Sequence, residues 1–326
     1  MKKFLLLLRC LSFGKVLNIS LAWLTYVFAT LTRKAIIPPM PSAVSIEAVN
    51  YCNLQCKECA TGQAMHSRQA QAISVDLAKN ILENAKTHAF IFQFYWQGEP
   101  FLHSQWFQIC RYAVQKNYFV MLSTHAQSMS ELLASDIVKS GLQQLIISLD
   151  GFDQESYEAY RVGGSFTKTI EAIQQLQTAK QLNKSITPII TVQCLVTAAN
   201  EHKLDLIKSI AVKAGADEVV FKSMQIYKNP MLLPKNSKYN RYKRSNGKLT
   251  LKRTHRWDCY RIFNTLLVDS SGNVYPCCYD KDGEYLLGNT STKDLKDIWQ
   301  SSKYQEFRIK VLTKQNQPKM CLNCNR

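Results

Sequence analysis

Three cysteines lie within one short segment of the chain, residues 51–60. Cys52, Cys56 and Cys59 follow the spacing Cys-x3-Cys-x2-Cys. A [4Fe–4S] cluster that only carries electrons normally has four cysteine ligands. Three cysteines can hold three irons and leave the fourth open to another ligand, much as a catalytic zinc site keeps an open position. A zinc knuckle or three reduced thiols is the competing interpretation, but the nearest histidine is His66 and no second pair of ligands lies close by.

Strand-like and helix-like segments alternate from residue 44 onward, which predicts βα units around a parallel sheet. The predicted strands are residues 44–49, 90–96, 118–124, 144–150, 189–196 and 218–224. The predicted helices are residues 75–87, 104–117, 130–140, 166–182 and 201–214. Ser74 and Ser130 are suitable N-caps, and Gly141 and Gly215 are suitable helix ends. Six such units predict an α/β fold, a partial (βα)6 TIM-like barrel with its chemistry at the carboxyl ends of the strands.

Short motifs follow these strands at the end where the chemistry is expected. The second strand leads into Trp-Gln-Gly-Glu-Pro at residues 96–100, and Ser-Leu-Asp-Gly occupies residues 148–151. Together with the three cysteines, these motifs resemble the radical S-adenosylmethionine (radical SAM) superfamily. The resemblance implies a [4Fe–4S] cluster that is held by the three cysteines and binds S-adenosyl-L-methionine.

The resemblance also implies which residues contact that cofactor: Gly98, Glu99, Ser123, Ser148 and Arg161. A surface salt bridge is the competing role for Arg161. The sequence departs from the family pattern at two places. Gln97 stands where the family often has glycine, and His125-Ala126 stands where it often has Asn-Gly. The catalytic general base is not identified by any motif.

A second set of cysteines lies near the C-terminus. Cys259 and Cys277 have the spacing Cys-x12-Gly-x4-Cys, and Cys321 and Cys324 form a Cys-x2-Cys pair. Residues 266–275 predict a β-hairpin that turns at Gly272 and brings the first two cysteines together. The pattern resembles the SPASM/twitch extension of radical SAM enzymes and implies one auxiliary [4Fe–4S] cluster, with zinc as the competing metal. Cys278 is an alternative ligand, but the Gly-x4-Cys spacing favours Cys277.

Positive charge is concentrated in one segment. The net charge is +17, and residues 228–256 contain ten Lys or Arg and no Asp or Glu. Such a segment is usually a solvated linker, but it could bind phosphate, an acidic peptide, an anionic membrane surface or RNA. No RNA-binding motif accompanies it, so we do not expect a nucleic-acid partner.

The N-terminus contains an apolar stretch, residues 17–31, with basic residues on both sides. Its length of about 15 residues is short of the ~20 needed to cross a bilayer. Two interpretations stay open: an amphipathic helix at the membrane surface, or a helix packed against the barrel. Because iron–sulfur ligands need a reducing compartment, we expect a cytoplasmic protein, with peripheral association at the inner face of the membrane as a further prediction.

These features predict four regions: an apolar, amphipathic helical segment (1–43), the radical SAM barrel (44–227), a basic linker (228–257) and a small α+β cluster domain containing the hairpin (258–326). The resemblance implies a radical SAM oxidoreductase that cleaves S-adenosylmethionine reductively and abstracts hydrogen from a sugar, polyol, lipid-linked metabolite or peptide. The auxiliary cluster would accept an electron, and flavodoxin or ferredoxin would supply reductant. A peptide maturase and a non-catalytic iron–sulfur scaffold or electron carrier are the alternatives.

Overall fold

The computed structural model describes residues 2–245, 248–252 and 259–324. Its centre is a run of six parallel strands, in which each strand pairs with the next along the chain. The strands are β1 (Ala43–Ile46), β2 (Ile91–Gln93), β3 (Phe119–Thr124), β4 (Gln144–Ser148), β5 (Ile189–Val196) and β6 (Glu218–Ser223). All six predicted strands are therefore present, and the prediction of a partial α/β barrel is confirmed.

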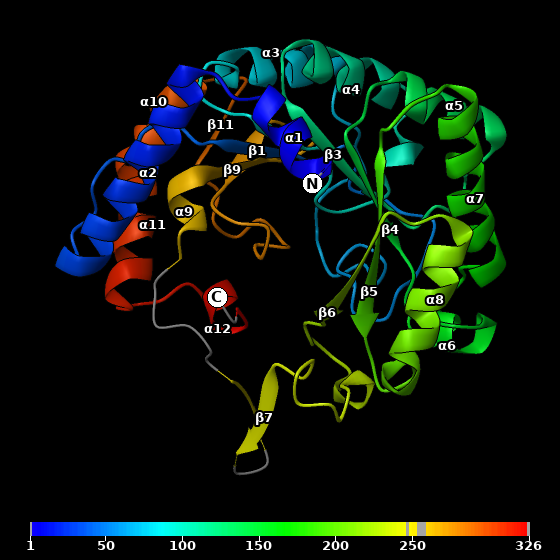
Figure 1. The fold of residues 1–326 in the computed structure, drawn as a ribbon. Coiled ribbons are helices and arrows are strands. Elements are labelled where there is room, and N and C mark those ends of the chain that lie inside the picture. Colours follow the sequence, from blue (N-terminus) through cyan, green and yellow to red (C-terminus); the bar gives the residue numbers. More distant parts are fainter. Residues whose placement is uncertain (1, 246–247, 253–258, 325–326) are drawn as a thin grey trace.

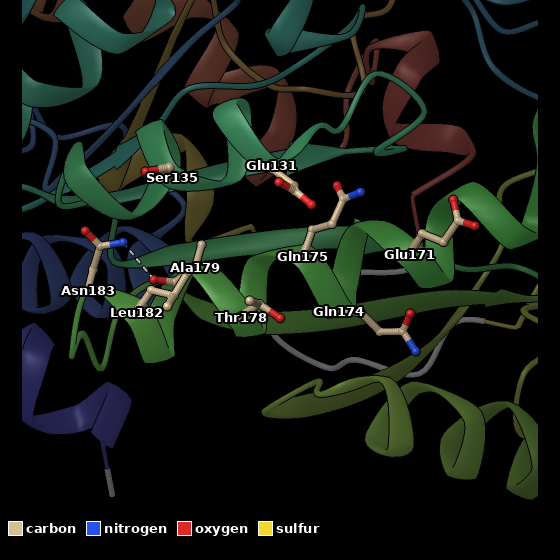
Figure 2. A pocket seen from close by; sticks show the side chains of 9 residues that line it. All are labelled: Glu131, Ser135, Glu171, Gln174, Gln175, Thr178, Ala179, Leu182 and Asn183. Atoms are coloured by element: carbon tan, nitrogen blue, oxygen red, sulfur yellow. Dashed lines mark hydrogen bonds between the residues drawn. The ribbon is translucent and has the colours of Figure 1, made fainter.

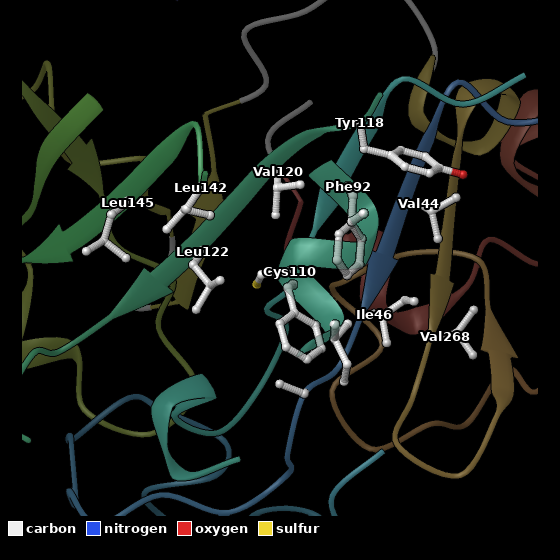
Figure 3. Close-up of a cluster of buried hydrophobic side chains, with 14 of the residues drawn as sticks. Val44, Ile46, Phe92, Cys110, Tyr118, Val120, Leu122, Leu142, Leu145 and Val268 are labelled. Atoms are coloured by element: carbon white, nitrogen blue, oxygen red, sulfur yellow. The ribbon is translucent and has the colours of Figure 1, made fainter. Parts of the chain in front are cut away.

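Helices cover the outside of this sheet (Figure 1). They are α3 (Val75–Ala85), α4 (Trp106–Gln115), α5 (Glu131–Lys139), α6 (Gln154–Glu158), α7 (Phe166–Leu182) and α8 (Leu204–Ala214). The short helix α6 was not predicted. Val44, Phe92, Val120 and Leu122 point toward the helices and have no exposed surface (Figure 3). Because side chains alternate along a strand, the residues between them face the barrel interior.

The predicted C-terminal hairpin joins the barrel sheet. It consists of β9 (Thr265–Val268) and β10 (Asn273–Tyr275), and β11 (Gly288–Asn289) pairs with β10. Strand β9 runs parallel to β1, with partners from Ala43↔Thr265 to Ile46↔Val268. Helices α9 (Arg261–Asn264), α10 (Leu295–Gln300), α11 (Ser302–Thr313) and α12 (Lys319–Leu322) belong to the same part of the chain. The second cysteine set is thereby attached to the edge of the barrel where the first set begins, while the division into four regions stays a prediction.

Two helices precede the barrel, α1 (Lys2–Arg9) and α2 (Phe13–Thr32). Helix α2 has 20 residues, more than the apolar stretch predicted from the sequence, and it alone among the described helices has the length and hydropathy of a membrane span. One third of its apolar window is nevertheless buried inside the protein. Its inner face packs on the body through Tyr26, whose ring meets Tyr260 at 5.1 Å and Phe263 at 5.7 Å between centroids.

The basic linker forms a two-stranded antiparallel hairpin, β7 (Tyr242–Ser245) and β8 (Lys248–Leu251). Three 3-10 turns complete the described elements: η1 (Pro100–Leu102), η2 (Glu201–Lys203) and η3 (Pro230–Leu232). Two of the predicted basic residues, at positions 253 and 256, lie outside the described residues.

Candidate functional site

The first cysteine loop follows β1 at the carboxyl end of the sheet. Cys56 is buried and Cys52 and Cys59 are partly buried, all three against an apolar cluster that includes Leu54 and Tyr160. Burial raises the pKa of Cys52 to about 12 and that of Cys56 to about 11. A thiol in such surroundings ionises when a metal coordinates it, which makes these cysteines better suited to metal binding than to free nucleophilic chemistry.

The donor set at this loop fits a cubane cluster. All three cysteines are free thiols. Within the described part of the chain, no three His, Cys, Asp or Glu side chains are grouped tightly enough to hold one metal ion. The cysteines of a cubane each bind a different iron, so they stand further apart than the ligands of a single ion. Gly62 lets the chain fold back on the loop, because a Cβ there would lie 2.8 Å from the Cys56 nitrogen.

Gly98 and Glu99 lie directly behind this loop. Gly98 has a φ of +71°, and a Cβ on it would lie 2.3 Å from the Val49 carbonyl oxygen and 2.7 Å from that of Tyr51. The backbone of Glu99 donates to the same Tyr51 oxygen at 3.0 Å. Glycine is therefore required at position 98 because the backbone there lies close to the chain that leads into the cysteine loop. That Gly98 also contacts S-adenosylmethionine stays a prediction.

The carboxylate of Glu99 is buried and already accepts several hydrogen bonds. Its Oε1 accepts from the Thr124 hydroxyl at 2.7 Å and from the Phe101 N–H at 3.2 Å. Its Oε2 accepts from the His125 N–H at 3.0 Å, and His125 Nε2 lies 3.2 Å away. Glu99 thus joins the turn after β2 to the residues after β3, and its role toward the cofactor stays a prediction.

Arg161 forms a buried ion pair, not the surface salt bridge considered above. Its Nε donates to Asp150 Oδ2 at 2.6 Å, and Asp150 Oδ1 accepts from the Leu195 N–H at 2.6 Å. Arg161 Nη1 also points at Cys56 Sγ, 3.9 Å away. Burial disfavours the guanidinium charge, but Asp150 and then Cys56 outweigh it and hold the pKa of Arg161 well above its ordinary value. Arg161 therefore places positive charge beside the cysteine loop.

Two serines were also predicted to face the cofactor. Ser123 lies on β3, where it pairs with Ile146 of β4, and Ser148 ends β4 opposite Gln193 of β5. Both alternate along their strands with buried residues that face the helices, so both lie on the interior side of the barrel. Their contact with S-adenosylmethionine stays a prediction.

The second cysteine set gathers beside α9 and α12. Burial, with a smaller contribution from Cys259 and Cys324, raises the pKa of Cys321 to about 12, so these three thiols lie close enough to interact. Cys278 Sγ accepts a hydrogen bond from Arg261 Nη1 at 3.0 Å. That Cys277 rather than Cys278 is the ligand stays a prediction.

Two family models match the regions of the chain that contain the two cysteine sets. One family model, the radical SAM superfamily, matches residues 46–194, and a second, an iron–sulfur cluster-binding domain (SPASM), matches residues 259–325. The chain belongs to the radical SAM superfamily. Membership implies a [4Fe–4S] cluster with S-adenosylmethionine in the barrel, and the SPASM match implies auxiliary iron–sulfur binding, as predicted.

Two curated relatives each match a part of this radical SAM chain. It is 26% identical to the mycofactocin maturase MftC of Mycolicibacterium smegmatis over 176 residues, which are 54% of this chain and 43% of that protein. It is 36% identical to the S-adenosyl-L-methionine-dependent 2-deoxy-scyllo-inosamine dehydrogenase of Niallia circulans over 69 residues, 21% of this chain and 27% of that protein. These two matches thus span less than half of each of the two relatives.

A solved structure confirms the radical SAM fold over most of the chain. Streptococcus suis SuiB bound to S-adenosylmethionine superposes with a TM-score of 0.66 at 14% identity, covering 87% of this chain and 71% of SuiB. At this identity the likeness concerns the fold alone.

Two neighbouring side chains that follow β2 contact the SPASM region, and one of them also contacts the cysteine loop. Trp96 Nε1 donates to the Cys278 carbonyl at 3.0 Å, and Gln97 Nε2 donates to the Lys281 carbonyl at 2.5 Å. Gln97 Oε1 accepts from the Thr61 hydroxyl at 3.1 Å, just beyond Cys59. In the sequence, Gln97 stood out only as a departure from the family pattern. The structure shows that it contacts both cysteine regions.

A second contact of the cysteine loop, made by Glu58 with the chain after β6, was not predicted from the sequence. The carboxylate of Glu58, between Cys56 and Cys59, accepts backbone N–H bonds from Tyr227 at 2.6 Å and Asn229 at 2.6 Å. It thereby fixes the chain that leaves β6 against the cysteine loop. The available signal in the sequence was an acidic residue between two metal-binding cysteines. A carboxylate buried at that position requires several hydrogen-bond donors from the surrounding chain.

A pocket of about 340 Å³ lies elsewhere, between α5 and α7 on the outside of the radical SAM barrel (Figure 2). Most of its lining residues have polar side chains, among them Glu131, Glu171 and Gln175. It contains none of the predicted site residues, so it is not the site described here.

Proposed function

We propose that this protein is a radical SAM oxidoreductase in which two iron–sulfur sites act on one substrate. Two side chains carry this proposal: Gln97, which bonds Thr61 of the first cysteine region and the Lys281 carbonyl, and Trp96, which bonds the Cys278 carbonyl. When bound and reduced, the [4Fe–4S] cluster with S-adenosylmethionine supplies a 5′-deoxyadenosyl radical that takes a hydrogen atom from an unactivated C–H bond.

The chain's own residues have separate tasks in this proposal. Cys52, Cys56 and Cys59 leave one iron open for S-adenosylmethionine. Arg161 places a fixed positive charge beside Cys56, where it would stabilise the negative charge of the thiolates. The second cysteine set offers four ligands, which leaves no open position and suits electron acceptance from the substrate. The net change would then be an oxidation.

The comparisons support two different substrate classes. The 36% identity to the 2-deoxy-scyllo-inosamine dehydrogenase favours a sugar- or polyol-like substrate, or a lipid-linked form of one. The alternative is a peptide maturase. MftC is named a maturase, and SuiB has also been solved with the precursor peptide SuiA. A non-catalytic iron–sulfur scaffold is less well supported, because the three cysteines, Gly98 and Glu99 are all present.

The test uses anaerobically reconstituted protein, S-adenosylmethionine, a reductant and an extract of cells grown in heavy water. The extract is divided into peptide, polar-metabolite and lipid fractions, and mass spectrometry measures deuterium in 5′-deoxyadenosine. We expect label from one fraction, which would name the substrate class. Cys52→Ala is the control and should give no 5′-deoxyadenosine. If the fully loaded protein forms none either, the enzymatic proposal is wrong and the scaffold interpretation replaces it.

A further inference from the structure

The two N-terminal helices expose an unusual amount of apolar surface. Nearly half of the exposed large apolar side chains in the described part of the chain lie on α1 and α2. Phe13 is 86% exposed, Leu31 71% and Leu24 55%. We call this surface the N-terminal apolar face; its members are Phe4, Leu5, Leu8, Phe13, Val16, Leu17, Leu21, Trp23, Leu24, Phe28 and Leu31. Exposed apolar surface concentrated in this way marks an interaction site.

The members on α2 form one side of the helix. Phe13, Leu17, Leu24, Phe28 and Leu31 follow one another at spacings of 4, 7, 4 and 3 residues, which places them in one stripe. The residues that α2 buries lie on the opposite side: Lys15, Asn18, Ala22, Tyr26, Ala29 and Thr30. Packing against the barrel therefore accounts for the inner face of α2 and leaves the outer face without a partner among the described residues.

The charge of this region indicates which kind of partner the N-terminal apolar face can bind. The first 46 residues contain six Lys or Arg and no Asp or Glu. Lys2 and Arg9 are exposed at the ends of α1, and Lys34 is exposed just beyond α2. An apolar helix face with a tryptophan and with basic residues at its ends is the pattern of helices that lie in the plane of an anionic membrane.

We propose that α1 and α2 bind the surface of an anionic phospholipid bilayer and insert the N-terminal apolar face at the boundary between headgroups and acyl chains. A second copy of the chain fits this face less well, since it would bring the same positive charges together. The proposal does not depend on the radical chemistry.

The inner face of α2 explains why the helix lies on the bilayer instead of crossing it. Asn18 Nδ2 donates to the Met40 carbonyl at 2.7 Å. The ammonium of Lys15, which is buried, donates to the carbonyls of Cys10 at 3.2 Å and Asn117 at 3.1 Å. A spanning helix would separate Lys15 from Asn117 and Asn18 from Met40, and it would bring the polar side chain of Asn18 toward the hydrocarbon, which is costly.

The lipid-binding surface leaves the barrel mouth accessible. Leu6 and Cys10 of α1 pack against Phe119 and Ile189, the first residues of β3 and β5. Helix α1 therefore lies at the amino ends of the strands, over the centre of the barrel in Figure 1. The cysteine loop follows β1 at the opposite, carboxyl ends.

The experiment measures co-sedimentation of the full-length, cluster-loaded protein with vesicles of phosphatidylcholine, with and without phosphatidylglycerol. The test variant is Leu17→Asp/Leu24→Asp. Both residues are exposed, so the fold should be retained. The matched control is Leu132→Asp/Leu182→Asp, which adds the same charge at residues that are 73% and 79% exposed on α5 and α7.

We expect binding to the anionic vesicles that weakens with added salt, a loss of at least about tenfold in the test variant, and no loss in the control. Equal binding by the test variant and the wild type would overturn the proposal. If no vesicle is bound and the test variant instead converts a dimer to a monomer in sedimentation velocity, the face binds a second copy. Protein in native membranes that resists extraction at alkaline pH would mean that α2 spans the bilayer.

Discussion

Gly98→Ala is the sharpest test of how the structure holds its first cysteine loop. The new methyl group would lie 2.3 Å from the Val49 carbonyl oxygen and 2.7 Å from that of Tyr51. These atoms belong to the backbone that leads into Cys52, so the overlap can be relieved only by moving the loop. The substitution should therefore reduce both stability and iron binding at this site.

The size of the effect can be separated into two parts with a matched variant. Gly163 also has a positive φ, +82°, but a Cβ there would meet only Leu54 Cδ2, at 3.9 Å. Gly163→Ala should cost only the backbone strain, about 1–2 kcal/mol. Gly98→Ala should cost that strain plus overpacking, which adds about 1–3 kcal/mol. The difference between the two variants isolates the contact with Val49 and Tyr51.

Anaerobic urea unfolding and iron analysis provide the assay. We expect Gly98→Ala to lose more unfolding free energy than Gly163→Ala and to bind less iron in the three-cysteine loop, while its auxiliary site stays loaded. If the two variants lose the same free energy and keep the same iron content, the close contact of Gly98 with Val49 and Tyr51 has no energetic weight.

Three further predictions concern the cluster sites. Two cubanes require about eight irons per chain. Cys52→Ala should halve this number and abolish S-adenosylmethionine cleavage. A Cys52→Ala variant that still cleaves S-adenosylmethionine would exclude Cys52 as a ligand. Cys321→Ala should leave cleavage intact but uncoupled from substrate oxidation, whereas full turnover would show that the auxiliary cluster is dispensable. Gln97→Ala removes a hydrogen-bond partner of Thr61 and the donor to the Lys281 carbonyl. It should cost about 1–3 kcal/mol of stability and shift the electron paramagnetic resonance signal of the auxiliary cluster. An unchanged signal would show that Gln97 does not couple the two sites.

Local patterns predicted the elements of the barrel well. Helix α7 begins and ends at the predicted residues, 166 and 182. Ser74 and Ser130 are N-caps as predicted, since their side chains accept from the N–H groups of Leu77 and Leu133. These features depend on residues within one turn of each other, so a short stretch of sequence contains the whole cause.

Long-range pairing could not be predicted in the same way. The apolar pattern of residues 266–275 predicted a hairpin, but not that β9 would pair in parallel with β1, more than two hundred residues earlier. Every apolar strand of this length could add to several sheet edges. The choice depends on what else covers each edge, which short-range periodicity does not record.

The motif at residues 96–100 shows a different limit of prediction from the sequence. A family motif indicates which residues approach a ligand, but each residue must also satisfy its own buried surroundings. Gly98 makes room for the backbone of Val49 and Tyr51, and Glu99 fills its acceptor sites with Thr124 and His125. Glu99 therefore has a structural role independent of S-adenosylmethionine. Loss of activity on its substitution would not by itself prove contact with the cofactor, and a measurement of S-adenosylmethionine affinity in a folded, iron-loaded variant is what distinguishes the two roles.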